Sequence, residues 1–343
     1  MTVLIGTFAY NRHLQNVALA LLEAGLLGGY ETGWVDVYRS ATGKAFRRAV
    51  ARAAPSMAAL LSRRAFDRQL EPYVRPHRFL ESVRIGLEKT GASRLLTNWL
   101  HDRSTFSLDR HCAALMRGAD HDAYFGTEFS ALHALQACRE TGKAGIVAFL
   151  SPHHRFRERW VDREYDRFPE LLRADTRKLL KHSEFSDARR DAEAAQSDLI
   201  HAGSELVRQT LVDAGIPYSK IMVSQLGAPV PIVRAPAPPS ATPRFIYAGS
   251  VAVHKGVHYL LQAWRRLGVA SAIELHLYGI NTLPGQVLEG LPGNITFHGH
   301  VSPDVLRQAM IGAEALVFPT LCDGFGMVVA EAMAELATTV AAG

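Results

Sequence analysis

The 343-residue chain has few cysteines and no long apolar run. Its three cysteines, Cys112, Cys138 and Cys322, are scattered and form no Cys-x-x-Cys pair, which argues against a disulfide framework and a structural zinc site. Nowhere do about 18 apolar residues follow one another, and the opening MTVLIGTFAY lacks the basic start of a secretory signal. We therefore expect a reduced, cytoplasmic protein without a membrane span.

Several ligand-binding motifs are also missing from the sequence. It contains no Gly-x-Gly-x-x-Gly fingerprint, no Walker loop and no aspartate-rich metal motif, so we expect neither a dinucleotide cofactor nor a bound metal. No nucleic-acid-binding motif accompanies the basic charge, which argues against a nucleic-acid partner.

The composition is that of a folded protein with two domains. Hydrophobic residues make up 48% of the chain and charged residues 21%, which is typical of globular proteins. Single domains usually contain about 100–200 residues, so this length favours two domains.

Positive charge is concentrated between residues 44 and 78. Nine Lys or Arg residues stand there against two acids, Asp67 and Glu71, while the net charge of the chain is +5. Apolar residues interleave with the bases at roughly helical spacing. The segment is either a solvated basic face or an amphipathic surface that associates with anionic lipid at the inner face of a membrane, or with an anionic acceptor.

The first part of the chain alternates between strand-like and helix-like segments. A short apolar run at 2–8 predicts a strand, and 11–27 predicts a helix; the stretch that follows, to about 118, is rich in Arg and Ala and predicts mostly helix. Residues 122–129, 130–142 and 143–151 predict strand, helix and strand. A polar helix over 185–203 then leads into another strand, and a short strand follows within 214–231. This order indicates a parallel sheet covered by helices.

Proline marks the expected domain boundary. Six of the sixteen prolines lie between Pro229 and Pro243, where they prevent both helix and central strand. We therefore expect an N-terminal domain over 1–232, a linker over 233–242 and a C-terminal domain over 243–343. The last of these shows a clean Rossmann-like alternation, in which Val257, Leu260, Leu261, Trp264 and Leu267 share one helix face, and Ser302 and Pro303 begin a later helix.

Two loops of the C-terminal domain carry residues suited to a phosphate ligand. In YAGSVAVHKG, a strand ends at Gly249, and Lys255 stands before a helix, where backbone donors and positive charge favour an anion; a purely structural lysine is the alternative. In LCDGFGMVVAE, Gly324 and Gly326 permit close approach of a ligand. Asp323 is a ligand contact or a helix cap, and Glu331 is either a ligand contact or a solvent-facing side chain.

The order of these features resembles the retaining glycosyltransferases of family 4, which have the GT-B fold. Both the loop AGSVAVHKG and the spacing in DGFGMVVAE are similar to that family, from about residue 194 to 334. The resemblance implies an α/β protein with two Rossmann-like domains facing a cleft. It also implies an enzyme that moves a sugar from a nucleotide-sugar donor to a glycan, lipid or other acceptor, with retention of anomeric configuration and without a cofactor or metal.

The resemblance also implies roles for particular residues. Lys255 would bind the donor phosphates and support the leaving group, Asp323 would hold the donor sugar and phosphate, and Glu331 would bind the ribose hydroxyls. The donor-binding residues implied are Gly249, Ser250, Lys255, Gly256, Asp323, Gly324, Phe325, Gly326 and Glu331. Such a site implies catalysis by fixed cationic and amide hydrogen-bond donors that stabilise the negative charge on the departing phosphate.

The sequence departs from the family pattern at several positions. Ser250 stands where members often carry an arginine, so one phosphate cation is missing or is replaced by His254, and Asp323 replaces a glutamate. Thr127 stands where many relatives have a histidine, which leaves Glu128, His153 and His154 as acceptor-side candidates; a polar loop is the alternative for the two histidines.

The C-terminal stretch departs from the family pattern and is the basis for the alternatives to a working transferase. Residues 335–338 replace the turn expected in the family, and about 100 residues are available for the second domain, so we expect that domain to be partial and the chain truncated. The alternatives to a transferase are an inactive remnant or non-catalytic binding module and, less well supported, a nucleotide-sugar epimerase or hydrolase of the same fold.

Overall fold

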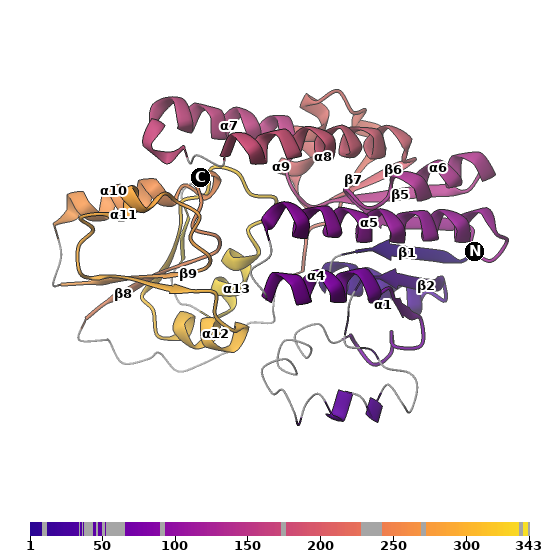
Figure 1. Ribbon diagram of the computed structural model, residues 1–343, viewed down its shortest axis with the longest axis horizontal. Coiled ribbons are helices and arrows are strands. Elements are labelled where there is room, and N and C mark those ends of the chain that lie inside the picture. Colours follow the sequence, from indigo (N-terminus) through magenta and orange to yellow (C-terminus); the bar gives the residue numbers. More distant parts are fainter. Residues whose placement is uncertain are drawn as a thin grey trace. The chain divides into compact units, whose positions relative to one another are not determined.

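In the computed structural model the chain divides into two units, each built around a sheet of mainly parallel strands (Figure 1). The structure describes residues 1–343 apart from 9–11, 34, 36, 38–43, 46, 50–51, 53–65, 90–92, 173–175, 228–241, 269–271, 336–338 and 342–343. Unit 1 comprises Met1–Phe149, Phe185–Ala202 and Ile216–Met222; unit 2 comprises Leu150–Glu184, Gly203–Gly215 and Val223–Gly343.

Unit 1 contains a seven-stranded sheet with the order β3-β2-β1-β4-β5-β6-β7, and its pairings from β3 to β6 are parallel. The strands are β1 (Val3–Thr7), β2 (Leu27–Thr32), β3 (Val74–Pro76), β4 (Ala123–Thr127), β5 (Ala144–Phe149), β6 (Leu199–Ala202) and β7 (Ile221–Val223). Leu4, Ile5, Tyr30 and Tyr124 are fully buried on these strands, which places the core at the centre of the sheet.

Several described helices of unit 1 lie between these strands in the chain. They are α1 (Arg12–Glu23), α4 (Phe79–Lys89), α5 (Arg94–Arg117), α6 (Leu132–Thr141) and α8 (Thr176–Gln196), whose C-terminal part belongs to unit 1. Two strands correct the prediction of a mostly helical stretch to 118. β2 begins at Leu27, separated from the end of α1 by three residues, and β3 lies within the arginine-rich region, where Val74 pairs with Tyr30 of β2.

Unit 2 contains a five-stranded sheet with the order β10-β9-β8-β11-β12, and every pairing in it is parallel. The strands are β8 (Arg244–Ala248), β9 (Glu274–Tyr278), β10 (Ile295–Gly299), β11 (Ala315–Phe318) and β12 (Thr339–Ala341). The last strand follows α13 and pairs with β11, so the sheet continues beyond the point at which the sequence leaves the family pattern.

Helices of unit 2 come from both sides of the proline-rich region. They are α7 (His154–Arg167), η1 (Pro169–Leu171), α9 (Glu205–Asp213), η3 (Val253–Lys255), α10 (Val257–Leu267), α11 (Gly285–Leu288), α12 (Pro303–Ile311) and α13 (Met327–Glu335). The start of α12 is as predicted: the Ser302 hydroxyl accepts a hydrogen bond from the Val305 N–H at 3.3 Å, and Pro303 is the first helical residue.

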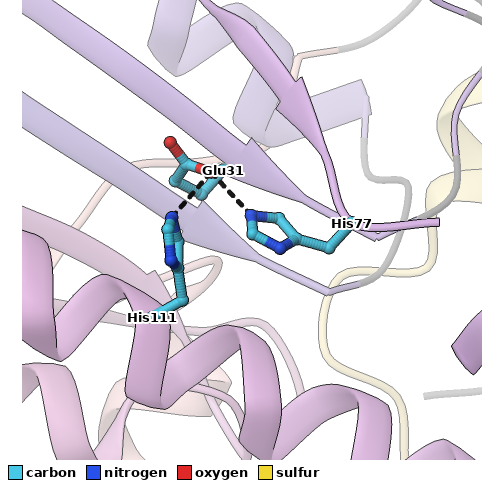
Figure 2. A group of neighbouring side chains, drawn as sticks. All are labelled: Glu31, His77 and His111. Atoms are coloured by element: carbon cyan, nitrogen blue, oxygen red, sulfur yellow. Dashed lines mark hydrogen bonds and ion pairs between the residues drawn. The ribbon is translucent and has the colours of Figure 1, made fainter. Parts of the chain in front are cut away.

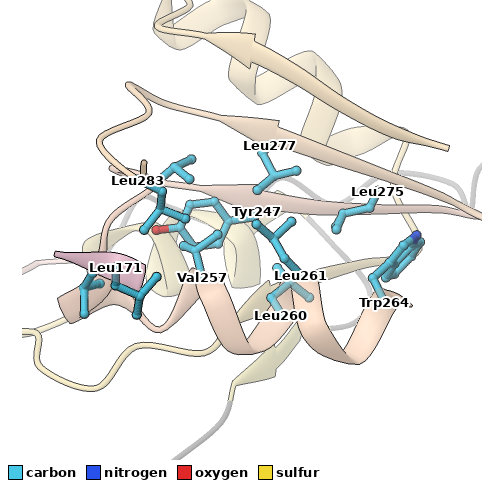
Figure 3. Packing of buried hydrophobic residues seen from close by; sticks show 11 residues of the cluster. Leu171, Tyr247, Val257, Leu260, Leu261, Trp264, Leu275, Leu277 and Leu283 are labelled. Atoms are coloured by element: carbon cyan, nitrogen blue, oxygen red, sulfur yellow. The ribbon is translucent and has the colours of Figure 1, made fainter. Parts of the chain in front are cut away.

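The core beneath the candidate loops is formed by α10 and the strands it covers (Figure 3). Val257, Leu260, Leu261 and Trp264 are buried against Tyr247, Leu275 and Leu277. Leu267, which the sequence places on the same helix face, is instead 59% exposed at the last position of the helix.

Some predictions fall outside the described residues. Most of the linker (233–241) and much of the basic segment (46, 50–51 and 53–65) belong to this group, so the predicted domain boundaries and basic surface stay predictions. Lys44, Arg47, Arg48 and Arg52 are described and exposed. Over the described part of the chain, none of the helices combines the length and the apolar character needed to cross a membrane.

Candidate functional site

The candidate site of unit 2 lies where two adjacent parallel strands end. β8 and β11 are neighbours in the sheet, so the loops that leave their carboxyl ends lie at the same edge. The first loop leads through η3 into α10, and the second leads into α13. This topology brings together Lys255 and Asp323, which are 68 positions apart in sequence: the Lys255 Nζ donates to the Asp323 Oδ2 at 2.5 Å.

Backbone and side-chain hydrogen bonds fix the first loop. The N–H of Gly249 donates to the Tyr278 carbonyl at 2.9 Å, and the buried Tyr247 hydroxyl donates to the Ser250 carbonyl at 2.7 Å. Gly249 has φ +145°, a conformation that residues with a side chain rarely adopt. The predicted residues Gly249 and Ser250 are therefore exposed but held in one backbone conformation.

The two loops are joined through their backbones. The N–H groups of Leu321 and Cys322 donate to the His254 carbonyl at 3.1 and 3.2 Å. Gly256 has φ +65°, and a Cβ at this position would lie 1.9 Å from the Pro319 carbonyl oxygen. Only glycine therefore allows the loops to approach this closely, and the approach sets the position of Lys255.

Asp323 makes contacts on both sides of its carboxylate. Its Oδ2 pairs with Lys255, and its Oδ1 accepts from the Gly324 N–H at 2.8 Å. Because α13 begins only at Met327, these bonds tie the loop together and do not support the helix-cap alternative. The side chains of Lys255 and Asp323 are 18% and 27% exposed, so the pair is accessible to a ligand.

The glycine-rich turn is packed tightly within unit 2. A Cβ on Gly324 would lie 1.9 Å from the Leu150 carbonyl oxygen, and the Ser204 hydroxyl donates to the Gly324 carbonyl. Gly326 has φ +69°. Phe325 and Glu331 are half-buried, with Glu331 on α13 eight positions after Asp323.

The electrostatics of the site favour an anion. Burial, together with the charges of Lys255 and Arg157, lowers the pKa of His254 to about 4, so this histidine is neutral at pH 7 and does not replace the arginine missing after Gly249. Arg157 lies on α7, which packs against η3. It is half-buried and contributes a positive charge that the local sequence does not indicate, because Arg157 precedes Lys255 by 98 positions.

The acceptor-side candidates have structural contacts of their own. The His153 Nδ1 accepts from the Arg155 N–H at 3.3 Å and caps α7, while the His153 N–H donates to the Thr210 hydroxyl at 3.0 Å. His154 lies 3.7 Å from Glu158 on the same helix, so these histidines begin a helix and are not a polar loop. Glu128 belongs to unit 1, where it lies 3.5 Å from Arg190.

Comparison with known proteins identifies the C-terminal part of the chain. Residues 242–342 match the family model described as Glycosyl transferases group 1. These residues form a glycosyltransferase domain. No curated protein matches the sequence.

Solved glycosyltransferase structures resemble the whole chain. The lipopolysaccharide outer core galactosyltransferase WaaB is 14% identical over 100% of this chain and 82% of its own, with a TM-score of 0.54. Sucrose-phosphate synthase from Thermosynechococcus elongatus is 15% identical over 99% and 80%, with a TM-score of 0.58. HepE from Anabaena, in complex with UDP-glucose, is 14% identical over 99% and 80%, with a TM-score of 0.52.

These similarities confirm the α/β fold and its GT-B architecture. The family match of residues 242–342, on the fold that these structures share, supports an enzyme that transfers glycosyl groups.

Proposed function

We propose that the chain is a retaining glycosyltransferase of family 4 that uses a nucleotide-sugar donor. The observation that carries this proposal is the accessible Lys255–Asp323 pair at the carboxyl ends of adjacent parallel strands, inside the glycosyltransferase domain. The complex of the similar HepE with UDP-glucose supports a nucleotide-sugar donor. A glycan, a lipid or another acceptor is the proposed recipient of the sugar.

In this proposal Lys255 binds the donor diphosphate and neutralises the charge that builds up when the sugar leaves. Asp323 positions the ammonium group before the donor arrives, because a lysine side chain has several rotatable bonds that must otherwise be ordered on binding. Arg157 provides the second positive charge near the phosphates, in place of the arginine absent at Ser250.

The remaining contacts to the donor come from both loops and from α13. The backbone of Gly249, Ser250 and Gly256 lines the phosphate side, and Asp323 with the Gly324–Phe325–Gly326 turn holds the sugar. Glu331 binds the ribose hydroxyls, for which a half-buried carboxylate is a suitable acceptor. We propose that transfer needs no cofactor.

The proposal also covers the acceptor side and localisation. Glu128, His153 and His154 remain acceptor-side candidates, although the capping role of His153 already accounts for its burial. We place the enzyme in the cytoplasm, with peripheral attachment to the inner face of the membrane through residues 44–78.

The decisive experiment compares Lys255→Ala and Lys255→Arg with the wild type. Release of nucleoside diphosphate is measured across a panel of nucleotide sugars and glycan or lipid acceptors. Removing one fixed donor to the developing charge is expected to lower turnover by about 100- to 1,000-fold, and Lys255→Arg should recover part of it. The anomeric configuration of the product, read by NMR, tests retention.

Arg266→Ala provides the matched control, because Arg266 is exposed in the last turn of the helix that follows Lys255. This variant should keep wild-type turnover. Folded wild-type protein that neither binds nor transfers any sugar of the panel would contradict the proposal, and so would undiminished transfer by Lys255→Ala.

A further inference from the structure

A cluster of metal-ligating side chains lies in unit 1, whereas the candidate donor residues belong to unit 2 (Figure 2). Glu31 is the penultimate residue of β2, His77 directly follows β3, and His111 lies on α5. Since β2 and β3 are parallel neighbours, Glu31 and His77 both stand near the carboxyl ends of their strands. The His77 N–H donates to the Thr32 carbonyl at 2.8 Å, which fixes this histidine beside β2.

The two imidazoles converge on one carboxylate oxygen. The Nε2 of His77 lies 2.8 Å from the Glu31 Oε2, and the Nε2 of His111 lies 3.6 Å from the same oxygen. The ring centroids are 4.5 Å apart, and one ligand atom from each residue lies within 4.8 Å of the others. Two ligand atoms around a tetrahedral metal with bonds of about 2.1 Å are about 3.4 Å apart, so small rotations of the rings give this geometry.

Burial makes the carboxylate a strong ligand and leaves the histidines accessible. The Glu31 side chain is fully buried, whereas those of His77 and His111 are 36% and 43% exposed. A buried carboxylate needs a cation to offset its lost hydration. Arg75 reaches the Oε1 at 3.4 Å but is itself 56% exposed, and it leaves the Oε2 to the histidines.

We propose that Glu31, His77 and His111 form a binding site for a divalent transition metal ion of the zinc type. Two imidazoles and one carboxylate match the ligand preference of zinc and its first-row neighbours, whereas Mg²⁺ and Ca²⁺ prefer oxygen ligands. Three protein ligands leave the fourth position of a tetrahedral ion for water or another ligand. The exposed histidine side provides the entry path.

An ion-pair network without metal is the competing explanation. In that case Arg75 at the Oε1 and His77 at the Oε2 would already give each oxygen of Glu31 a partner, and the network would not need His111. A metal ion explains why both imidazole nitrogens face the same oxygen. The cluster was missed in the sequence because Glu31 and His77 are 46 positions apart and form no local motif.

The test uses the full chain after removal of metal by a chelator. Co²⁺ is added as the probe, and the absorption bands of tetrahedral cobalt are recorded; Zn²⁺ should displace it at one equivalent. His77→Ala, His111→Ala and Glu31→Gln should each weaken Zn²⁺ binding by at least about 100-fold, because loss of a direct ligand exceeds the 10- to 100-fold effect of an outer-shell partner. Zn²⁺ should also raise the unfolding midpoint of the wild type.

His133→Ala is the matched control. Its Nδ1 lies 2.8 Å from Asp109 and its side chain is 36% exposed, as for His77, but its carboxylate partner is approached by Arg189 instead of a second histidine. Circular dichroism confirms that each variant is folded, and Glu31→Gln preserves the side-chain volume. Absence of the tetrahedral cobalt spectrum in the wild type, or equal weakening by His133→Ala, would overturn the proposal. Neither outcome depends on nucleotide-sugar binding.

Discussion

His13 is a histidine whose protonation is coupled to the stability of unit 1. Burial and the nearby His201 lower its pKa to about 4, and the two rings stack with centroids 5.0 Å apart. Between this value and about 6.5 the unfolded chain binds more protons than the folded one, so stability is lost as the pH falls through that range.

We therefore predict that His13→Gln reduces the acid sensitivity of unit 1. Urea midpoints at pH 7.5 and pH 5 should lie further apart in the wild type than in the variant. The limit for one group is about 1.4 kcal/mol per pH unit, and we expect less because the ring is only partly buried and solvent screens it. Midpoints that fall in parallel for both proteins would contradict the lowered pKa.

The sequence alone predicts site residues that belong to a short local motif. Lys255 and Asp323 each stand in a glycine-rich turn after an apolar strand, so they could be selected, and the structure brings them into contact. Arg157 could not be found in this way. It reaches the site through the packing of α7 on η3, and nothing in its local sequence predicts that contact.

At the scale of elements, α10 has glycines in the left-handed conformation at both ends. Gly256 precedes the helix with φ +65°, and Gly268 follows it with φ +61°. The two differ in surroundings: a Cβ on Gly256 would meet the Pro319 carbonyl at 1.9 Å, whereas none of the described atoms lies within 4 Å of one on Gly268. Substitution of Gly268 therefore tests backbone strain alone, whereas substitution of Gly256 adds a steric clash to the same strain.

We predict that Gly268→Ala costs about 1–2 kcal/mol, the strain of a left-handed residue with a side chain. Gly256→Ala should cost about 1–3 kcal/mol more, because the two loops must move apart. Unfolding midpoints measure this difference. Nucleotide-sugar affinity should fall only in Gly256→Ala, since that variant displaces Lys255; equal effects of both substitutions would disprove the clash.

Some helices and strands could be predicted from their own sequence, and others could not. α10 carries an apolar stripe, β8 and β11 are mainly apolar runs, and β9 alternates between polar and apolar residues, so the order of elements in unit 2 follows from local pattern. α7 is mostly polar, and its buried Glu164 lies 2.7 Å from His258 and accepts from the Tyr259 hydroxyl at 3.1 Å, partners that lie more than 90 positions away in sequence. β3 has three residues and is defined by its pairing with β2, which local sequence does not contain.

At the scale of the whole molecule, the charge is strongly uneven. Residues 44–78 contain nine bases and two acids, a net +7, while the whole chain carries +5, so the remainder carries −2. A weakly acidic body with one basic segment is attracted to an anionic surface in one orientation only, since each base near such a surface contributes about 1 kcal/mol. This asymmetry is the physical basis for the proposed attachment at the membrane.

We predict that the chain binds vesicles containing anionic lipid and that binding falls steeply with salt, because the Debye length shortens from about 30 Å at 0.01 M to about 8 Å at 0.15 M. Substitution of the exposed Arg47, Arg48 and Arg52 by Gln should remove most of the binding measured by sedimentation. A control with the same change in charge replaces three exposed arginines of α7 by Gln, namely Arg155, Arg159 and Arg163. If attachment depends on the basic segment and not on the total charge, the control variant should bind the vesicles as the wild type does. Equal loss of binding in the two variants, or vesicle binding that does not change with salt, would refute attachment through the segment.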